Sequence, residues 1–193
     1  MFELSSTVVY PGYGVAKISR EIVKKIENKE IFFYELNFIN KDVKILVPKI
    51  NLNSVGIRLL SDEREIKKIL GVFFEMVDSD FIQRLCMVSW NRRSKEYQNK
   101  IRKGDVEDIA FIYRDLKLIE KSKLLSFGEK AVLNQVEDLL SEEIGVVYNK
   151  NIQEASASLR NFVAECFTGK GNFYFLEKDF NLFVYASKGD VRI

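Results

Sequence analysis

The spacing of apolar residues in this 193-residue chain changes once, near residue 60. Before that point apolar and polar residues tend to alternate, and in residues 31–38 every second side chain is apolar, as in a β-strand with one buried face. After it, apolar residues recur every three or four positions, beginning with residues 66–74, as on one side of an α-helix. This change of period predicts an α+β fold, with a β-domain over residues 1–60 and an all-α domain over residues 61–168.

Short strands joined by turns fill the first 60 residues. Residues 7–10 are β-branched or aromatic, and the turn residues Pro11-Gly12-Tyr13-Gly14 follow directly. Two further strand patterns, residues 31–38 and 43–47, are separated by the polar turn Asn40-Lys41-Asp42. Four or five strands in so short a stretch favour a small twisted barrel over a sandwich, and we expect an SH3-like or Tudor-like β-barrel.

The second domain carries helix start and stop signals. Asp62 and Asp105 are placed to cap helices, and Gly104 is placed to end one. Ser126 and Glu129 have the Ser-x-x-Glu spacing of a capping box. The short connections predict that neighbouring helices pack antiparallel into a compact bundle.

Three later segments complete the pattern. Residues 78–87 predict a looser connection, whereas residues 152–167 predict a last helix. Residues 169–193 form an aromatic-rich tail, with a turn at residues 177–179 between two apolar runs. This tail fits a hairpin or an apolar segment folded onto the bundle, and exposed it would be a partner-docking surface.

The composition excludes several classes of chemistry. The chain has no histidine, so it has no Ser-His-Asp triad, no Cys-His dyad and no imidazole metal site. Its two cysteines, Cys86 and Cys166, have no CxxC spacing and predict buried reduced thiols, as in a reducing cytoplasm. No apolar run approaches the roughly 18 residues of a membrane span. We expect a soluble, cytoplasmic binding protein with no catalytic residue, metal or cofactor.

The strongest electrostatic feature follows the only tryptophan. Residues 91–103 carry six basic side chains and one acidic one, although the whole chain has a net charge of only +2. Such a stretch favours a polyanionic partner, or else it is a solvated helix face. Trp90 at its start is either a core anchor or an aromatic wedge that distorts base stacking beside the cations. The sequence pattern leaves both interpretations open.

Four motifs in order resemble the CarD/CdnL family of bacterial transcription regulators, whose first domain is shared with transcription-repair coupling factors. They are Thr7-Val8-Val9-Tyr10-Pro11-Gly12-Tyr13-Gly14-Val15, Ser89-Trp90-Asn91-Arg92-Arg93, Lys103-Gly104-Asp105 and Leu125-Ser126-Phe127-Gly128-Glu129-Lys130, and Val47-Pro48 is similar to the closing strand of the family's first domain. The resemblance covers residues 1–145. The helicase machinery of the repair factors is absent from this chain, which favours the two-domain regulator.

The resemblance implies a protein bound to the β subunit of RNA polymerase, at its protrusion or lobe, and located at the nucleoid through it. The β-domain would dock by strand addition, and the helical domain would contact promoter DNA at the upstream edge of the melted region. The implied DNA-binding residues are Trp90, Arg92, Arg93, Lys95, Lys100, Arg102 and Lys103. Where some members carry an arginine this chain has Leu46, and the expected polymerase-binding residues are Lys24, Lys25, Lys44, Ile45, Leu46 and Val47.

Three hypotheses follow from these patterns. The first is a polymerase accessory factor that stabilises the open promoter complex through a Trp90 wedge. The second is a protein-interaction adaptor that binds polymerase or another partner without direct DNA contact, and in which Trp90 belongs to the core. The third is a general DNA-binding protein, which the acidic residues 105–193 disfavour, because they predict weak binding to DNA alone. None of the three involves a small-molecule substrate or a membrane.

Overall fold

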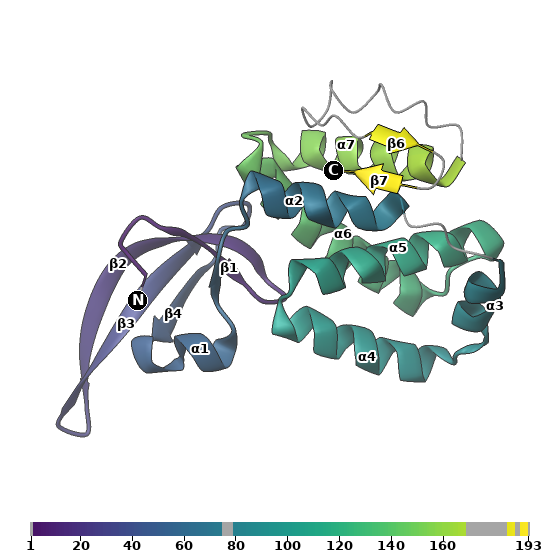
Figure 1. Cartoon of the computed structure of the whole chain (residues 1–193). Helices are drawn as coiled ribbons and strands as arrows, with labels where there is room; N and C mark the ends of the chain where they lie inside the picture. The colour runs from purple at the N-terminus through teal and green to yellow at the C-terminus, as the bar shows by residue number, and fades with distance from the viewer. Residues whose placement is uncertain (1, 75–78, 169–184, 188–189, 193) are drawn as a thin grey trace.

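The computed structural model describes residues 2–74, 79–168, 185–187 and 190–192. A β-domain lies on one side and a helical domain on the other, and a long hairpin projects from the β-domain away from the helices (Figure 1). The α+β prediction is therefore confirmed. The hairpin expected around residues 177–179 lies outside the described residues.

Five strands form one antiparallel sheet in the order β4-β3-β2-β1-β5. They are β1 (Thr7–Tyr10), β2 (Gly14–Ile26), β3 (Lys29–Phe38), β4 (Lys44–Pro48) and β5 (Arg58–Leu59). The short η1 (Lys49–Asn51) and α1 (Leu52–Val55) connect β4 to β5. Among the described strands no ladder joins β4 to β5, so the barrel-like sheet is open between these two edges.

The alternating pattern of residues 31–38 sets the core of this domain. Tyr34, Leu36 and Phe38 are buried on one face of β3, together with Val8 and Ile18 from the neighbouring strands. Phe32 has the same parity but is exposed, because β2 and β3 extend beyond the rest of the sheet as the projecting hairpin (Figure 1).

The helical domain contains α2 (Glu63–Gly71), η2 (Val72–Phe74), α3 (Ser79–Met87), α4 (Trp90–Lys103), α5 (Val106–Ser122), α6 (Phe127–Val147) and α7 (Ile152–Thr168). Their apolar faces enclose one core around Tyr113, Leu116 and Ile119, which are fully buried. A separate two-stranded ladder joins β6 (Tyr185–Ser187) to β7 (Asp190–Arg192).

The expected helix ends are confirmed, and one expected loop is wrong. Asp62 and Ser126 each form a capping box, and Asp105 accepts hydrogen bonds from two amides of α5. Gly104 ends α4 with a left-handed φ of 76°. Residues 79–87, expected as a looser connection, form helix α3, whose apolar residues recur at helical spacing and contact α5.

The two domains meet where β2 contacts α6. The buried carboxylate of Glu142 accepts a hydrogen bond of 3.0 Å from the Val15 amide and lies 3.2 Å from the Lys41 ammonium. Gly14 is required there, because a Cβ at this position would lie 1.8 Å from the Glu142 Oε2 atom. The domain junction thus contains a buried carboxylate of α6 whose hydrogen-bond donor and cation both come from the β-domain.

The neighbouring residue on α6 makes a second connection. Arg58 of β5 donates two hydrogen bonds of 2.7 Å to the buried carboxylate of Glu143, and the Ser61 amide donates a third of 3.1 Å. Arg58 also donates to the carbonyl of Gly104 at the end of α4. Because a bidentate arginine–carboxylate pair fixes orientation as well as distance, these contacts hold the two domains in one arrangement.

Candidate functional site

Trp90 is the first residue of α4, at the end of that helix remote from the sheet (Figure 1). Its side chain is half-buried and contacts the core of the helical domain. The indole lies against Gly128 near the start of α6, where a Cβ would come within 2.7 Å of Trp90 Nε1. One side of the ring therefore rests on the bundle, while part of it remains accessible.

The outer face of α4 is cationic. The exposed basic residues of this helix are Arg92, Lys95, Arg102 and Lys103, and Glu96 is the one exposed acid between them. A shallow depression of about 370 Å³ lies along the same face, lined by Lys95 and Arg102 with three small or amide side chains. Because α4 spans 14 residues, its two pairs of cations are separated by roughly 15 Å along the axis.

Two of the basic residues in the expected DNA-binding set have interior or paired side chains. Arg93 lies on the inner side of α4, where its guanidinium pairs with buried Glu129 and donates to the carbonyl of Leu85 at 2.6 Å. Lys100 is half-buried, 3.1 Å from Asp108. The expectation that Arg93 contacts phosphate does not fit this placement, because a buried and paired guanidinium is not presented to a ligand.

Three exposed apolar side chains do not belong to the expected DNA-binding set. Leu124 is 92% exposed and Phe127 91% exposed on either side of the N-cap residue of α6, and Met87 is exposed at the end of α3. Phe127 directly precedes Gly128, the residue against which the Trp90 indole lies. A signal was available in the sequence, since Phe127 occupies the first turn of α6 outside the apolar stripe of that helix.

The expected polymerase-binding residues fall into two groups. Residues Lys44, Ile45, Leu46 and Val47 form β4, an edge of the sheet, with Lys44 and Leu46 exposed and Val47 buried in the core. Lys24 and Lys25 lie on the projecting hairpin, paired with Ile31 and Glu30 of β3. Lys44 pairs with Asn37, six residues from Ile31 along β3, so the two groups are about 20 Å apart.

The pairing register also decides which faces these residues share. Leu46 pairs with Glu35 and Lys24 pairs with Ile31, and both partners have the same parity on β3. Side chains of paired residues point to the same face of a sheet. Lys24, Lys44 and Leu46 therefore share the outer face of the sheet, whereas Lys25 lies on the opposite face of the hairpin.

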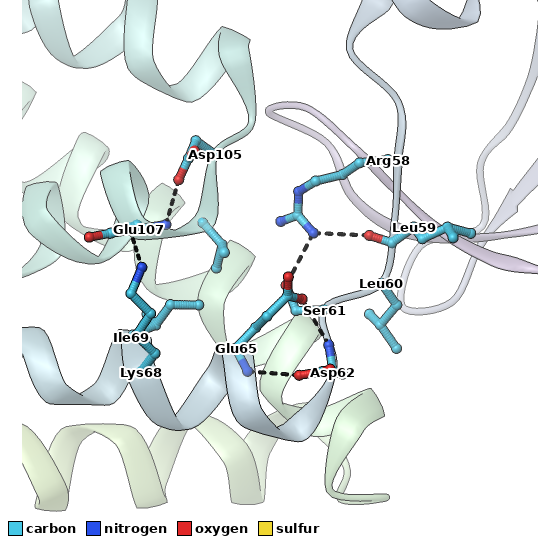
Figure 2. Close-up of a pocket in the computed structure, with 11 residues that line it drawn as sticks. Arg58, Leu59, Leu60, Ser61, Asp62, Glu65, Lys68, Ile69, Asp105 and Glu107 are labelled. Carbon is cyan, nitrogen blue, oxygen red and sulfur yellow. Dashed lines mark hydrogen bonds and ion pairs between the residues drawn. The ribbon is translucent and has the colours of Figure 1, made fainter. Parts of the chain in front are cut away.

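A cavity of about 530 Å³ lies at the domain junction, and Figure 2 shows its lining. Arg58 enters from β5, while Asp62 and Asp105 begin α2 and α5 on the other side. Both aspartates already accept hydrogen bonds from their own helix amides, and Lys68 lies 3.4 Å from Glu107. The polar groups of the lining are engaged with each other, and we assign no ligand to it.

The described residues offer neither a metal-binding cluster nor a membrane-spanning helix. No group of three or more acidic or cysteine side chains gathers there in an arrangement that could hold a metal ion. Across the same ranges, no helix is long and apolar enough to cross a membrane.

Comparisons with known proteins match both domains. Residues 2–61 match the model of the "CarD-like/TRCF RID domain", and residues 83–160 match that of the "CarD, C-terminal domain". The chain is also 27% identical over 152 residues to the Bacillus subtilis (strain 168) protein named "Putative transcription factor YdeB", covering 76% of this chain and 92% of that protein. Both matched domains and their order agree with the resemblance of the sequence motifs. The chain therefore belongs to the CarD/CdnL family of transcription regulators.

Proposed function

We propose that this regulator binds the β subunit of RNA polymerase through its β-domain and stabilises the open promoter complex through contacts of Trp90 and α4 with DNA. The observation that carries the proposal is the position of Trp90. It is half-exposed at the start of α4, and the cationic outer face of the same helix begins two residues later.

The chemistry of this end of the helical domain suits distorted DNA. Arg92 and Lys95 supply charge for phosphates next to Trp90, and Phe127, the residue before Gly128, is an exposed aromatic ring at the start of α6. Stacking of one unpaired base on an aromatic ring contributes about 1–3 kcal/mol. Bases become available for such contacts only where the duplex is unstacked, so the protein binds the melted state more tightly than the closed duplex. That difference in affinity shifts the population toward the open complex.

The β-domain offers an edge for strand addition. The exposed edge of β4 carries Lys44 and Leu46, and a strand of the polymerase β subunit could extend the sheet there. The projecting hairpin adds exposed side chains on both of its faces. The apolar residues Val23 and Phe32 pair on one face, and Lys24 lies on the other. A sheet edge with unpaired main-chain hydrogen-bonding groups is what strand addition requires.

Trp90→Ala is expected to shorten the lifetime of the open promoter complex formed with this protein by about 10-fold, because one stacking contact is lost. The measurement is the decay of promoter melting after a competitor is added, with polymerase alone as the reference. Trp90→Phe, which keeps a ring, is expected to retain part of the effect. An unchanged lifetime with Trp90→Ala would favour the adaptor without DNA contact.

Leu46→Asp is expected to weaken binding to core polymerase by about 10-fold or more, since it places a charge on the apolar edge of β4. Leu59→Asp is the matched control, because Leu59 is also exposed but lies on β5 at the other edge of the same sheet. Binding is measured by titration of labelled full-length protein. Equal losses for the two variants would show that the β4 edge is not the docking site.

A further inference from the structure

Arg93 and Glu129 form an ion pair inside the helical domain, where the two side chains are 4% and 2% exposed. Arg93 comes from α4 and Glu129 from the first turn of α6, and Arg93 also donates to the carbonyl of Leu85 on α3 at 2.6 Å. One guanidinium therefore connects three helices at the end of the domain where α4 begins.

The same carboxylate organises the start of α6. Glu129 accepts a hydrogen bond of 2.8 Å from the Ser126 amide, and its own amide donates to Ser126 Oγ, which completes the capping box. Lys123 lies 3.4 Å from it. Burial alone would raise the pKa of Glu129, but the hydrogen bonds from Ser126 and the charges of Lys123 and Arg93 outweigh burial and lower it. The carboxylate is thus ionised and held at a fixed position.

The indole of Trp90 lies close to one member of this ion pair and to the residue that precedes the other. Gly128 precedes Glu129 in sequence, and its missing side chain leaves the space that the indole occupies. The guanidinium carbon of Arg93 lies 5.8 Å from the centre of the Trp90 ring. Trp90 and Arg93 share α4, whereas Gly128 and Glu129 belong to α6, so a change in the spacing between the two helices would move Gly128 relative to the indole.

A buried ion pair is weak evidence for stability, because its desolvation cost offsets much of its attraction and apolar replacements are often as stable. Its well-attested use is to specify one arrangement of the elements that it joins. Here the elements are α4, which begins with Trp90, and α6, whose first turn includes Gly128 against the indole.

We propose that Arg93 and Glu129 are positioning residues that set the orientation of the Trp90 indole for its contact with promoter DNA. The inference rests on the proposed function and assigns Arg93 a role other than a phosphate contact. Because Trp90 is the only tryptophan, the fluorescence of the free protein reports its environment directly.

The test is the full-length double variant Arg93→Met/Glu129→Gln. Glutamine keeps the capping box with Ser126, and methionine fills the volume of the arginine stem, so neither buried charge is left unpaired. Lys117→Met/Glu120→Gln is the matched control, because it removes both charges from a more exposed pair on α5, whose charges are 2.6 Å apart. Circular dichroism of both variants establishes that the helices are retained.

We expect the double variant to shift the tryptophan emission and to change its quenching by acrylamide about twofold, while open-complex lifetime falls by at least about threefold toward that of Trp90→Ala. The control is expected to match the natural protein in tryptophan emission, in quenching and in open-complex lifetime. A shortened lifetime with unchanged emission, or changed emission with an unchanged lifetime, would each overturn the positioning role. If Trp90→Ala itself leaves the lifetime unchanged, the proposed function fails first and this inference fails with it.

Discussion

Gly14→Ala is expected to lower the free energy of unfolding by roughly 2–5 kcal/mol, a large effect for one added methyl group. Gly14 has a φ of 109°, which a residue with a side chain adopts only with strain. Its new Cβ would also meet Glu142 Oε2 and displace the buried carboxylate from the Val15 amide. An amide left without a partner at the domain junction adds its own desolvation cost. Denaturant unfolding of the full chain measures the change.

Gly12→Ala in the same turn is the matched control. Gly12 also has a positive φ, 74°, but its Cβ would find its nearest atom, on Ile101, at 3.5 Å, an ordinary van der Waals contact. Only backbone strain of about 1 kcal/mol is expected there. In a Glu142→Ala background, Gly14→Ala should cost less, because the collision is removed. Equal costs for the two glycines would contradict the importance of the carboxylate contact.

The features that the sequence predicted best depend on neighbouring residues in the chain. Asp62 and Ser126 each have their capping partner three residues away, so both capping boxes follow from local spacing. The strands of the β-domain follow from alternation within single segments, and Gly104 ends α4 by its own left-handed backbone conformation. These features can therefore be predicted without knowing which distant residues pack against them.

The features that the sequence did not predict depend on distant partners. Arg93 looked like one more cation in a basic run, and only its partner 36 residues away at Glu129 explains its burial. Glu142 lies 127 residues from Val15, and no local pattern marks it as the acid at the domain junction. Helix α3 was missed although its apolar residues recur at helical spacing, and its packing partner α5 lies further along the chain, beyond α4.

These long-range contacts give α6 a role that its sequence does not reveal. Near its start Glu129 anchors α4 and the surroundings of Trp90, and near its end Glu142 and Glu143 anchor the β-domain. The 13 residues from Glu129 to Glu142 span about 20 Å of helix. One continuous helix therefore connects the proposed polymerase-binding domain to the proposed DNA contact, and buried carboxylates fix it at both ends.

The double variant Glu142→Ala/Glu143→Ala is expected to lose most of the stabilisation of the open complex, at least about 10-fold in lifetime, although it leaves both proposed contact surfaces intact. Without the two carboxylates, the Val15 amide and the Arg58 guanidinium lose their partners on α6, and the domains are free to reorient. Binding of the β-domain to polymerase then no longer holds the helical domain in a fixed position for its contact with DNA.

Three measurements separate this loss of coupling from loss of the surfaces themselves. Affinity for core polymerase should stay within about threefold of the natural protein, because β4 is unchanged, and Trp90 emission should be unaltered, because Glu129 is unchanged. Asp138→Ala, an exposed acid on the same helix, controls for the change in charge. If the domains of the double variant move independently and the open-complex lifetime is still natural, the protein does not need a fixed distance between its polymerase contact and its promoter contact. If instead polymerase affinity and lifetime fall in parallel, the carboxylates serve the β-domain alone, and α6 does not connect the two activities.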